Sequence, residues 1–309
     1  MNPQGGTELQ HSFLEQYADK KLLDQVQITT SVPEKITLHP TKPNILWQKN
    51  SYDQPNIAPW FSQKTNHNKY DWYVFNSNWT YEKFRMVFDL PTEKCHVIKN
   101  GCTSFPKRKI YKKGDPIRII HQNTPWRGLS VLLGAMQLVK NPLIKLDVYS
   151  STEVYGEEFK KQNDHTYVPL YKQASELSNV NYIGYRPNSF ILDNLNKYNM
   201  YVYPSIFEET SCISAIESLS AGLYSIVTNF GALYETCAEF PMYVTYTKDF
   251  KILSQTFATA IEMAAETLHE GTIQDSLDMQ QAFYKKYYNW DKRAMEWNNF
   301  LYNVINAKK

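Results

Sequence analysis

Short apolar runs alternate with segments of helical periodicity along most of the chain. In the first half, residues 44–47 (NILW) and 72–75 (WYVF) are typical of buried strands, and a helical pattern follows at residues 77–88. The second half repeats strand-like runs at residues 117–120, 146–149, 200–203 and 224–228, separated by helical patterns such as 128–139 and 190–197. This alternation predicts an α/β fold with a parallel sheet covered on both faces, and ligands bind at the carboxyl ends of such strands.

The chain is long enough for two domains. Its 309 residues exceed what one hydrophobic core usually holds. At the end of the sequence, Trp290, Ala294, Trp297, Leu301 and Val304 recur at helical spacing. An aromatic amphipathic helix of this kind can lie on a membrane surface, but packing against the rest of the protein is the commoner arrangement.

Composition narrows the class of protein without selecting a ligand. The hydrophobic content of 42% and charged content of 21% are ordinary for a globular protein, and a net charge of +2 favours no particular partner. The four cysteines show no metal-binding spacing, so we expect reduced thiols and no metal site. No apolar run reaches the ~20 residues that span a bilayer, and the first ten residues are polar. We therefore expect a cytoplasmic protein without a signal peptide or transmembrane segment.

The segment 204–235, PSIFEETSCISAIESLSAGLYSIVTNFGALYE, has the most specific chemistry. Glu209 and Glu217 flank a predicted helix start, for which Thr210 and Ser211 are suitable N-cap residues. Eight helical residues would separate the carboxylates by about 12 Å, whereas carboxylates that share acid–base work at one glycosidic bond lie roughly 5–9.5 Å apart. We therefore expect each glutamate to bind its own hydroxyls, with a diphosphate at the helix N–H groups between them. The alternative is a chance spacing, with Glu217 on a solvated helix face.

The pattern P-S-x3-E-x7-E-x4-A-G, followed by a strand and then Gly and Glu, resembles the retaining GT-B enzymes of the glycosyl transferases group 1 family. The resemblance implies two Rossmann-like domains with a cleft between them. It implies that Glu209 contacts the donor sugar and Glu217 the ribose of a nucleotide sugar. The amides that would contact the sugar hydroxyls or phosphate belong to Thr210, Ser211, Cys212 and Ile213.

Two departures from the family pattern concern the donor. The family usually has Gly-Phe-Gly where this chain has Thr210, Ser211 and Cys212, so side chains enter where backbone normally approaches the sugar. It also usually has proline at the position of Tyr224.

The resemblance assigns further donor contacts in the second half. Arg127 matches a lysine position whose cation neutralises the donor diphosphate, and Arg suits this role because its planar fork grips phosphate oxygens. The family's companion arginine is Gln122 here, which leaves the charge to Arg127, the helix dipole and the region of Thr124. The alternative is that Arg127 merely caps a surface helix. Tyr185 and Arg186 lie in a turn similar to the one beside the nucleobase.

The first half is less similar to the family. Gly5 and Gly6 precede a helical pattern and resemble the glycine loop that faces the donor phosphates. That loop normally follows a first strand, for which this sequence has no room, so we expect an abbreviated N-terminal domain. The expected division is residues 1–113 as the acceptor-side Rossmann-like domain, 114–289 as the nucleotide-sugar-binding domain, and 290–309 as a helix that packs back toward the first domain.

Two polar segments of the first half have competing interpretations. Residues 48–56 fall where the family often keeps a histidine near the donor sugar, and this chain has Lys49, Asn50 and Asp53 there. We expect a polar surface loop, with contact to donor or acceptor as the alternative. Residues 107–113 (KRKIYKK) are expected to be a solvated linker, and a nucleic-acid or lipid contact is the alternative.

The sequence thus predicts a retaining glycosyltransferase that uses a UDP- or GDP-sugar as donor, with no essential metal or cofactor. Arg127 and Glu209 are the expected catalytic residues, and positioning and charge stabilisation replace a covalent nucleophile. The acceptor is open and includes saccharides and lipids. A nucleic-acid base as acceptor, or a non-catalytic module that only binds a nucleotide sugar, are the two alternatives.

Overall fold

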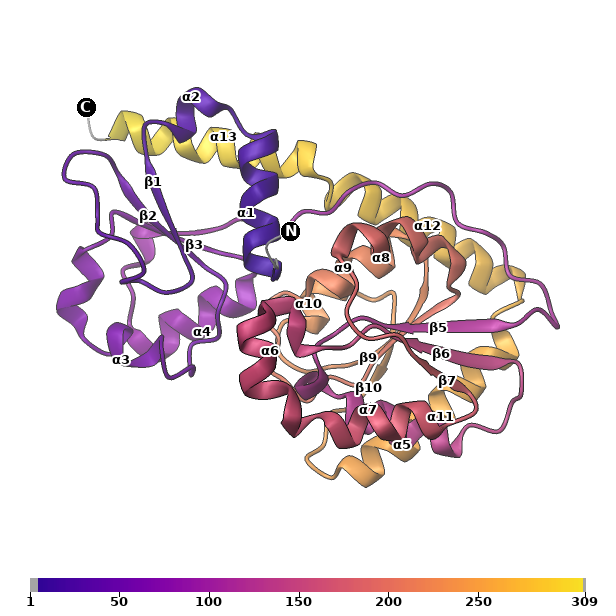
Figure 1. Ribbon diagram of the computed structural model, residues 1–309. Helices are drawn as coiled ribbons and strands as arrows, with labels where there is room; N and C mark the ends of the chain where they lie inside the picture. The colour runs from indigo at the N-terminus through magenta and orange to yellow at the C-terminus, as the bar shows by residue number, and fades with distance from the viewer. Residues whose placement is uncertain (1–4, 308–309) are drawn as a thin grey trace. The chain divides into compact units, whose positions relative to one another are not determined.

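The computed structural model describes residues 5–307, and its chain divides into two compact units. The N-terminal unit consists of Gly6–Cys102, the short segment Glu209–Ile213 and the chain from Tyr287 onward. The C-terminal unit consists of Thr103–Glu208 and Ser214–Lys286, and Gly5 is grouped with it. Each unit is an α/β structure with its own parallel sheet, as the sequence predicts (Figure 1).

The C-terminal unit is built on a six-stranded sheet in the order β10-β9-β8-β5-β6-β7, in which all neighbouring strands are parallel. Its strands are β5 (Ile117–His121), β6 (Ile144–Val148), β7 (Val180–Tyr182), β8 (Met200–Tyr203), β9 (Tyr224–Thr228) and β10 (Met242–Val244). Its helices are α5 (Leu129–Leu138), α6 (Glu157–Asn163), α7 (Val168–Glu176), α8 (Asn188–Asn194), α9 (Ile213–Ser220), α10 (Leu233–Cys237), α11 (Phe250–Thr267) and α12 (Gly271–Tyr287).

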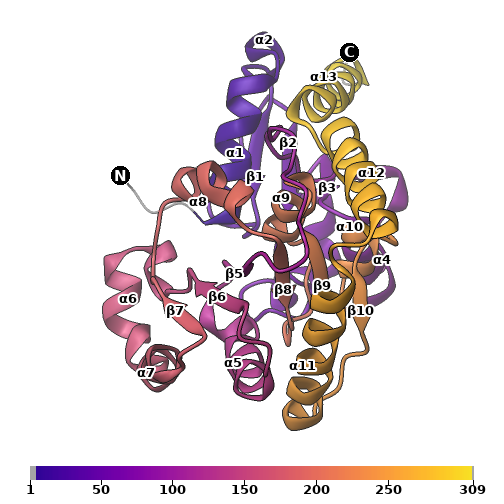
Figure 2. The same cartoon turned by 90° about the vertical axis from the view of Figure 1, so that its right-hand side faces the viewer.

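Helices cover both faces of this sheet. Figure 2 shows α5, α7 and α11 on one face and α8 and α9 on the other. The largest core cluster lies on the first face, where apolar residues of α5 and α11 pack on strand residues such as Ile119 and Val202. The strands predicted at 200–203 and 224–228 have the observed bounds, because nearly all of their residues are buried.

The strand order reverses between β5 and β8, which is the point where open α/β sheets usually bind ligands. The loops that follow these two strands approach each other very closely. Gly128 follows β5 with φ at +112°, and a Cβ built on it would lie 2.0 Å from the carbonyl oxygen of Pro204, which follows β8. Only glycine fits both this contact and this backbone conformation.

The N-terminal unit contains a four-stranded parallel sheet in the order β1-β2-β3-β4. Its strands are β1 (Gln27–Thr30), β2 (Asn44–Gln48), β3 (Trp72–Phe75) and β4 (Cys95–Val97). Its helices are α1 (Gly6–Tyr17), α2 (Lys20–Leu23), α3 (Ala58–Phe61), α4 (Asn78–Phe88) and α13 (Trp290–Ala307). The sequence analysis predicts β2, β3 and α4 but misses β1, since only one of the four β1 residues is fully buried.

Alternation along the strands divides the apolar residues of this unit between two cores. Trp47 and Val74 face a core that includes α1 and α13, whereas Leu46 and Phe75 face a core that includes α3 and α4. The five apolar residues predicted for the terminal helix, from Trp290 to Val304, are all buried in α13. Packing therefore explains their spacing.

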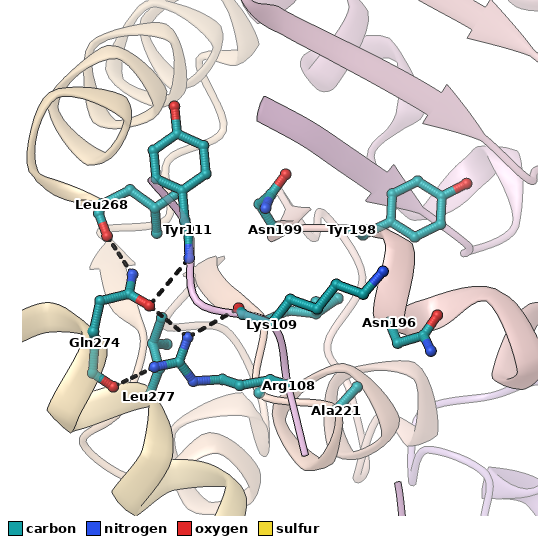
Figure 3. Close-up of a pocket in the computed structure, with 12 residues that line it drawn as sticks. Arg108, Lys109, Tyr111, Asn196, Tyr198, Asn199, Ala221, Leu268, Gln274 and Leu277 are labelled. Atoms are coloured by element: carbon teal, nitrogen blue, oxygen red, sulfur yellow. Dashed lines mark hydrogen bonds between the residues drawn. The ribbon is translucent and has the colours of Figure 1, made fainter. Parts of the chain in front are cut away.

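The basic stretch 107–113 is not a solvated linker throughout, which corrects the expectation from sequence. Arg108 is only 8% exposed and its Nε lies 2.8 Å from Oδ1 of Asp278. Its Nη1 donates to Oε1 of Gln274 at 2.7 Å, and its Nη2 donates to the Gln274 carbonyl. Figure 3 shows this guanidinium directed at α12. The charge of Arg108 anchors the start of the C-terminal unit.

The contact at Gly128 makes a stability prediction with two graded controls. Gly128→Ala should lower the free energy of unfolding by about 3 kcal/mol, since the methyl group meets backbone and the conformation is left-handed. Gly114→Ala should cost only about 1 kcal/mol, because Gly114 has φ at +91° and open space around it. Gly271→Ala has neither problem and should stay within about 0.5 kcal/mol of the parent. Urea denaturation measures all three, and equal effects at Gly128 and Gly114 would contradict the close backbone contact.

Candidate functional site

The loop after β5 carries the predicted phosphate-binding arginine. Arg127 ends a short 3₁₀ turn, Pro125–Arg127, directly before α5. The guanidinium Cζ lies 4.2 Å from the ring centroid of Phe207, which belongs to the loop after β8. Thr124, at the start of the turn, has a buried hydroxyl without a hydrogen-bond partner among residues 5–307. The short turn at the switch point of the sheet thus carries both a cation and a buried hydroxyl.

The side chain of Gln122 is hydrogen-bonded to the first turns of α9. Its Nε2 donates to the Ser214 carbonyl at 3.2 Å and to Oγ of Ser218 at 3.1 Å. The next residue, Asn123, donates from Nδ2 to Oγ of Ser214 at 2.7 Å. These bonds fix the first turn of α9 to the loop that carries Arg127. Where the family has a second arginine, Gln122 carries no charge. It instead joins its loop to α9 through hydrogen bonds.

The start of α9 differs from the prediction. The helix begins at Ile213, so Thr210 and Ser211 are not its N-cap. Cys212 precedes it in the left-handed conformation, with φ at +62°. The 12 Å estimate for the two carboxylates assumed continuous helix, which the structure does not have before Ile213. The family's glycine at this position matches the backbone requirement, and the sequence analysis misread its replacement as a change of side chain alone.

Glu217 lies inside the protein and not on a solvated face, which excludes the alternative of a surface position. Its side chain is buried, and Asn188 at the start of α8 donates from Nδ2 to its Oε1 at 3.1 Å. Burial raises the pKa of the Glu217 carboxyl to about 7, and the Asn188 hydrogen bond acts in the opposite direction. A buried carboxyl with one amide partner retains acceptor capacity for hydroxyl groups.

In the turn after β7, the side chain of Arg186 lies against the backbone of the turn itself. Gly184 has φ at +72°, and the exposed Arg186 donates from Nη1 to the carbonyl of Tyr185 at 2.7 Å. Its guanidinium therefore folds back on its own chain. Tyr185 is half-buried.

The predicted site residues from Glu209 to Ile213 belong to the N-terminal unit. Glu209, Thr210, Ser211 and Cys212 are all buried, and Ile213 is half-buried. Thr210 donates from Oγ1 to the Lys49 carbonyl at 2.9 Å, and its own carbonyl accepts from Oγ1 of Thr80 at 3.1 Å. A Cβ built on Gly6, the first residue of α1, would lie 2.8 Å from Cδ1 of Ile213. Gly6 thus permits a close contact in this unit, and Gly5 is buried just before it.

Lys49 differs from the expected surface position. It is 9% exposed, and its Nζ donates to Oδ1 of Asn100 at 3.0 Å. Burial lowers its pKa well below the ordinary lysine value, although the Glu8 carboxylate acts in the opposite direction. Asp53, in the same segment, is exposed as expected.

Neither a metal cluster nor a membrane-spanning helix is found in the described part of the chain. Residues 5–307 contain no group of three His, Cys, Asp or Glu side chains that could hold an ion. None of the helices within that range has the length and apolarity needed to cross a bilayer.

The comparison with protein families assigns the chain to a family. The family model described as "Glycosyl transferases group 1" matches residues 103–268, which is more than half of the chain. The chain therefore belongs to the glycosyl transferases group 1 family. No curated protein matches it in sequence.

Solved structures with the same fold have low sequence identity to this chain. A glycosyltransferase from Rickettsia africae has 14% identity and a TM-score of 0.66, over 100% of this chain and 84% of that one. Sucrose-phosphate synthase from Thermosynechococcus elongatus has 15% identity and a TM-score of 0.68, over 97% and 79% of the two chains. HepE from Anabaena, solved with UDP-glucose, has 15% identity and a TM-score of 0.61, over 86% and 72%. The fold is GT-B, as the resemblance implies.

The backbone at Cys212 makes a prediction that separates conformation from side-chain chemistry. Cys212→Gly should raise the free energy of unfolding relative to Cys212→Ala by up to about 1 kcal/mol, since glycine adopts the left-handed conformation without strain. Cys212→Val should be about 2 kcal/mol less stable than Cys212→Ala, because β-branching is least tolerated there. Chemical denaturation of the three variants measures this order, and a more stable valine variant would contradict the assigned conformation.

The raised pKa of Glu217 predicts a pH dependence of stability. Below about pH 4.5 the carboxyl is protonated in both states, and between pH 4.5 and 7 it ionises only in the unfolded chain. The folded state therefore loses up to about 3 kcal/mol relative to Glu217→Gln as the pH rises through this range. Urea midpoints of both proteins from pH 4.5 to 8 measure the difference. A constant difference would show that Glu217 is already ionised in the folded protein.

Proposed function

We propose that this protein transfers a sugar from a nucleotide-diphosphate sugar to a hydroxyl acceptor with retention of anomeric configuration. The main support for this proposal is the arrangement of residues where the strand order of the C-terminal sheet reverses, between β5 and β8. There the loop with Arg127 is hydrogen-bonded through Gln122 to α9, and α9 carries the buried Glu217. A cation, a helix N-terminus and a buried carboxyl on connected elements match a diphosphate joined to a ribose. Membership of the glycosyl transferases group 1 family supports the same reaction.

The transfer exchanges one bond to the anomeric carbon for another. The bond between that carbon and the diphosphate oxygen breaks, and the acceptor oxygen forms the new glycosidic bond. The acceptor's proton passes to the departing diphosphate, whose oxygens gain negative charge. Arg127 and the positive end of the α9 helix dipole stabilise this charge, and Glu209 binds sugar hydroxyls. No side chain forms a covalent bond to the sugar in this scheme.

The donor in this proposal is a UDP- or GDP-sugar, bound without an essential metal. HepE, which has the same fold, is described in complex with UDP-glucose. We also propose a cytoplasmic location, in keeping with four cysteines that form no disulfide within residues 5–307. The alternative of a nucleic-acid acceptor drew partly on the basic stretch 107–113. Arg108 is buried there, whereas the four lysines of the stretch are exposed.

Substitution of Arg127 tests the mechanism. Arg127→Ala should lower kcat by about 10²–10³-fold, because a lost charge stabiliser at the leaving group costs roughly 3–4 kcal/mol. Release of nucleoside diphosphate from UDP- and GDP-sugars, with and without candidate acceptors, provides the assay.

Arg118→Ala is the matched control for that experiment. Arg118 is an exposed arginine on β5, the same strand that leads to Arg127, and its loss should leave kcat unchanged. Near-normal transfer by Arg127→Ala would remove Arg127 from the mechanism. Failure of the parent protein to bind or cleave any nucleotide sugar would reject the proposed function itself.

A further inference from the structure

The backbone of the turn that carries Arg127 is held by packing and by a hydrogen bond. Trp126, the preceding residue, lies in a cluster of aromatic rings, with its ring centroid 5.9 Å from that of Tyr155 and 5.7 Å from that of Tyr167. The N–H group of Arg127 donates to the Thr124 carbonyl at 3.0 Å. These contacts fix the backbone of Arg127, but they do not set the direction of its long side chain.

The loop after β8 is held just as firmly as far as Phe207. Ser205 is fully buried, its Oγ donates to the Phe207 carbonyl at 2.8 Å, and the same oxygen accepts the Phe207 N–H group at 3.3 Å. The Ser205 carbonyl in turn accepts the hydroxyl of Thr228 on β9 at 3.0 Å. The contact between Gly128 and Pro204 joins this loop to the turn before α5. The Phe207 ring therefore projects from a backbone that the sheet holds in place.

The ring of Phe207 and the guanidinium of Arg127 meet between these two segments. The Cζ atom lies 4.2 Å from the ring centroid, well inside the limit of about 6 Å for a cation–π interaction. Both residues are half-buried, and partial removal from water strengthens such a contact. The ring is thus placed to hold the charged end of Arg127 in one direction.

This kind of contact is compatible with phosphate binding. A carboxylate partner would occupy the N–H groups of a guanidinium, and these are the groups that grip phosphate oxygens. The attraction to an aromatic face acts on the charge as a whole. Arg127 can therefore stay over the ring of Phe207 and still donate to a diphosphate.

We propose that Phe207 is a positioning residue, which orients the Arg127 guanidinium toward the diphosphate of the donor during transfer. This inference rests on the proposed function, because it concerns the same site. A long side chain that is already ordered loses less conformational freedom when it binds. Charge on the diphosphate is greatest in the transition state, so a misplaced cation should lower kcat more than it raises KM.

A purely space-filling role for Phe207 is the alternative, and the electronic character of the ring separates the two roles. Aromatic rings attract cations through the negative charge on their faces. Fluorine atoms on the ring edge withdraw that charge and change the size of the ring only slightly. A ring that only fills space would tolerate fluorine, whereas a ring that holds a cation would not.

The test replaces Phe207 in the full chain with 4-fluoro-, 3,5-difluoro- and 3,4,5-trifluorophenylalanine by nonsense suppression. Release of nucleoside diphosphate from UDP- and GDP-sugars measures the effect. We expect kcat to fall stepwise along the series, about 5- to 10-fold in total, with a smaller change in KM. The midpoint of thermal unfolding should stay the same, because the packing of the ring is preserved.

Two ordinary substitutions support the same comparison. Phe207→Leu keeps an apolar side chain but removes the aromatic face, so its kcat should fall at least as far as that of the trifluorinated protein. Phe207→Tyr keeps the face and should retain most of the parent kcat. A space-filling role would rank the two variants by fit alone.

A matched control uses the same fluorinated residues at Phe240. This ring is also half-buried in the C-terminal unit, where it packs on Phe283 at 5.5 Å and Tyr284 at 5.9 Å. Within residues 5–307 its recorded ring contacts are aromatic and include no cation. Fluorination of Phe240 should therefore leave kcat unchanged.

A double-substitution experiment shows whether the effect of Phe207 passes through Arg127. The affinity for UDP or GDP, measured by titration calorimetry, should fall along the fluorinated series in the parent protein. In the Arg127→Ala background the same series should leave that affinity unchanged, since no cation remains for the ring to hold.

The outcomes distinguish this inference from the proposed function. Equal kcat along the fluorinated series, or an equal decline in affinity in the Arg127→Ala background, would overturn the role of Phe207. Sugar transfer that depends on Arg127 would still stand in either case. If the parent protein neither binds nor cleaves any UDP- or GDP-sugar, the proposed function fails, and the positioning role fails with it.

Discussion

The backbone contact between Gly128 and Pro204 is the constraint on which the rest of the C-terminal unit depends. It joins the loops after β5 and β8 at the reversal of strand order, where a side chain of any size would force them apart. Arg127 and Phe207 lie on either side of this contact, and α9 is fixed to the same loop through Gln122. The site is therefore positioned by backbone geometry first, and its charged side chains are added to a scaffold that is already close-packed.

Much of the fold is predictable from local patterns, and the reasons for the failures are physical. Fully apolar runs such as residues 72–75 and 200–203 give the strands with the correct bounds, because burial on both faces requires apolar residues throughout. β1 escapes detection since its residues are mostly polar and half-buried. The burial of Arg108 could not be predicted either, because its partner Gln274 lies 166 residues away in the sequence.

In the candidate site, too, some features are visible in the sequence and others depend on packing. The spacing of Glu209 and Glu217 and the position of Arg127 are visible in the sequence, and the family match covers the segment that contains them. The conformation of Cys212 and the buried amine of Lys49 depend on packing that no local pattern reveals. For this reason the sequence predicts the residues of a donor site, while the backbone and burial around them come from the structure.

The division of the N-terminal unit along the chain has a consequence for biosynthesis. Residues 6–102 are translated first, but Trp297 and Leu301 of α13, which cover Trp47 and Val74, emerge about 190 residues later. At about 5–20 residues per second the ribosome needs roughly 10–40 s to reach them. During that interval one apolar face of the nascent sheet has no permanent cover, so it is a natural substrate for chaperones. Synthesis of α13, and not of residues 6–102, therefore sets when this unit acquires its native core.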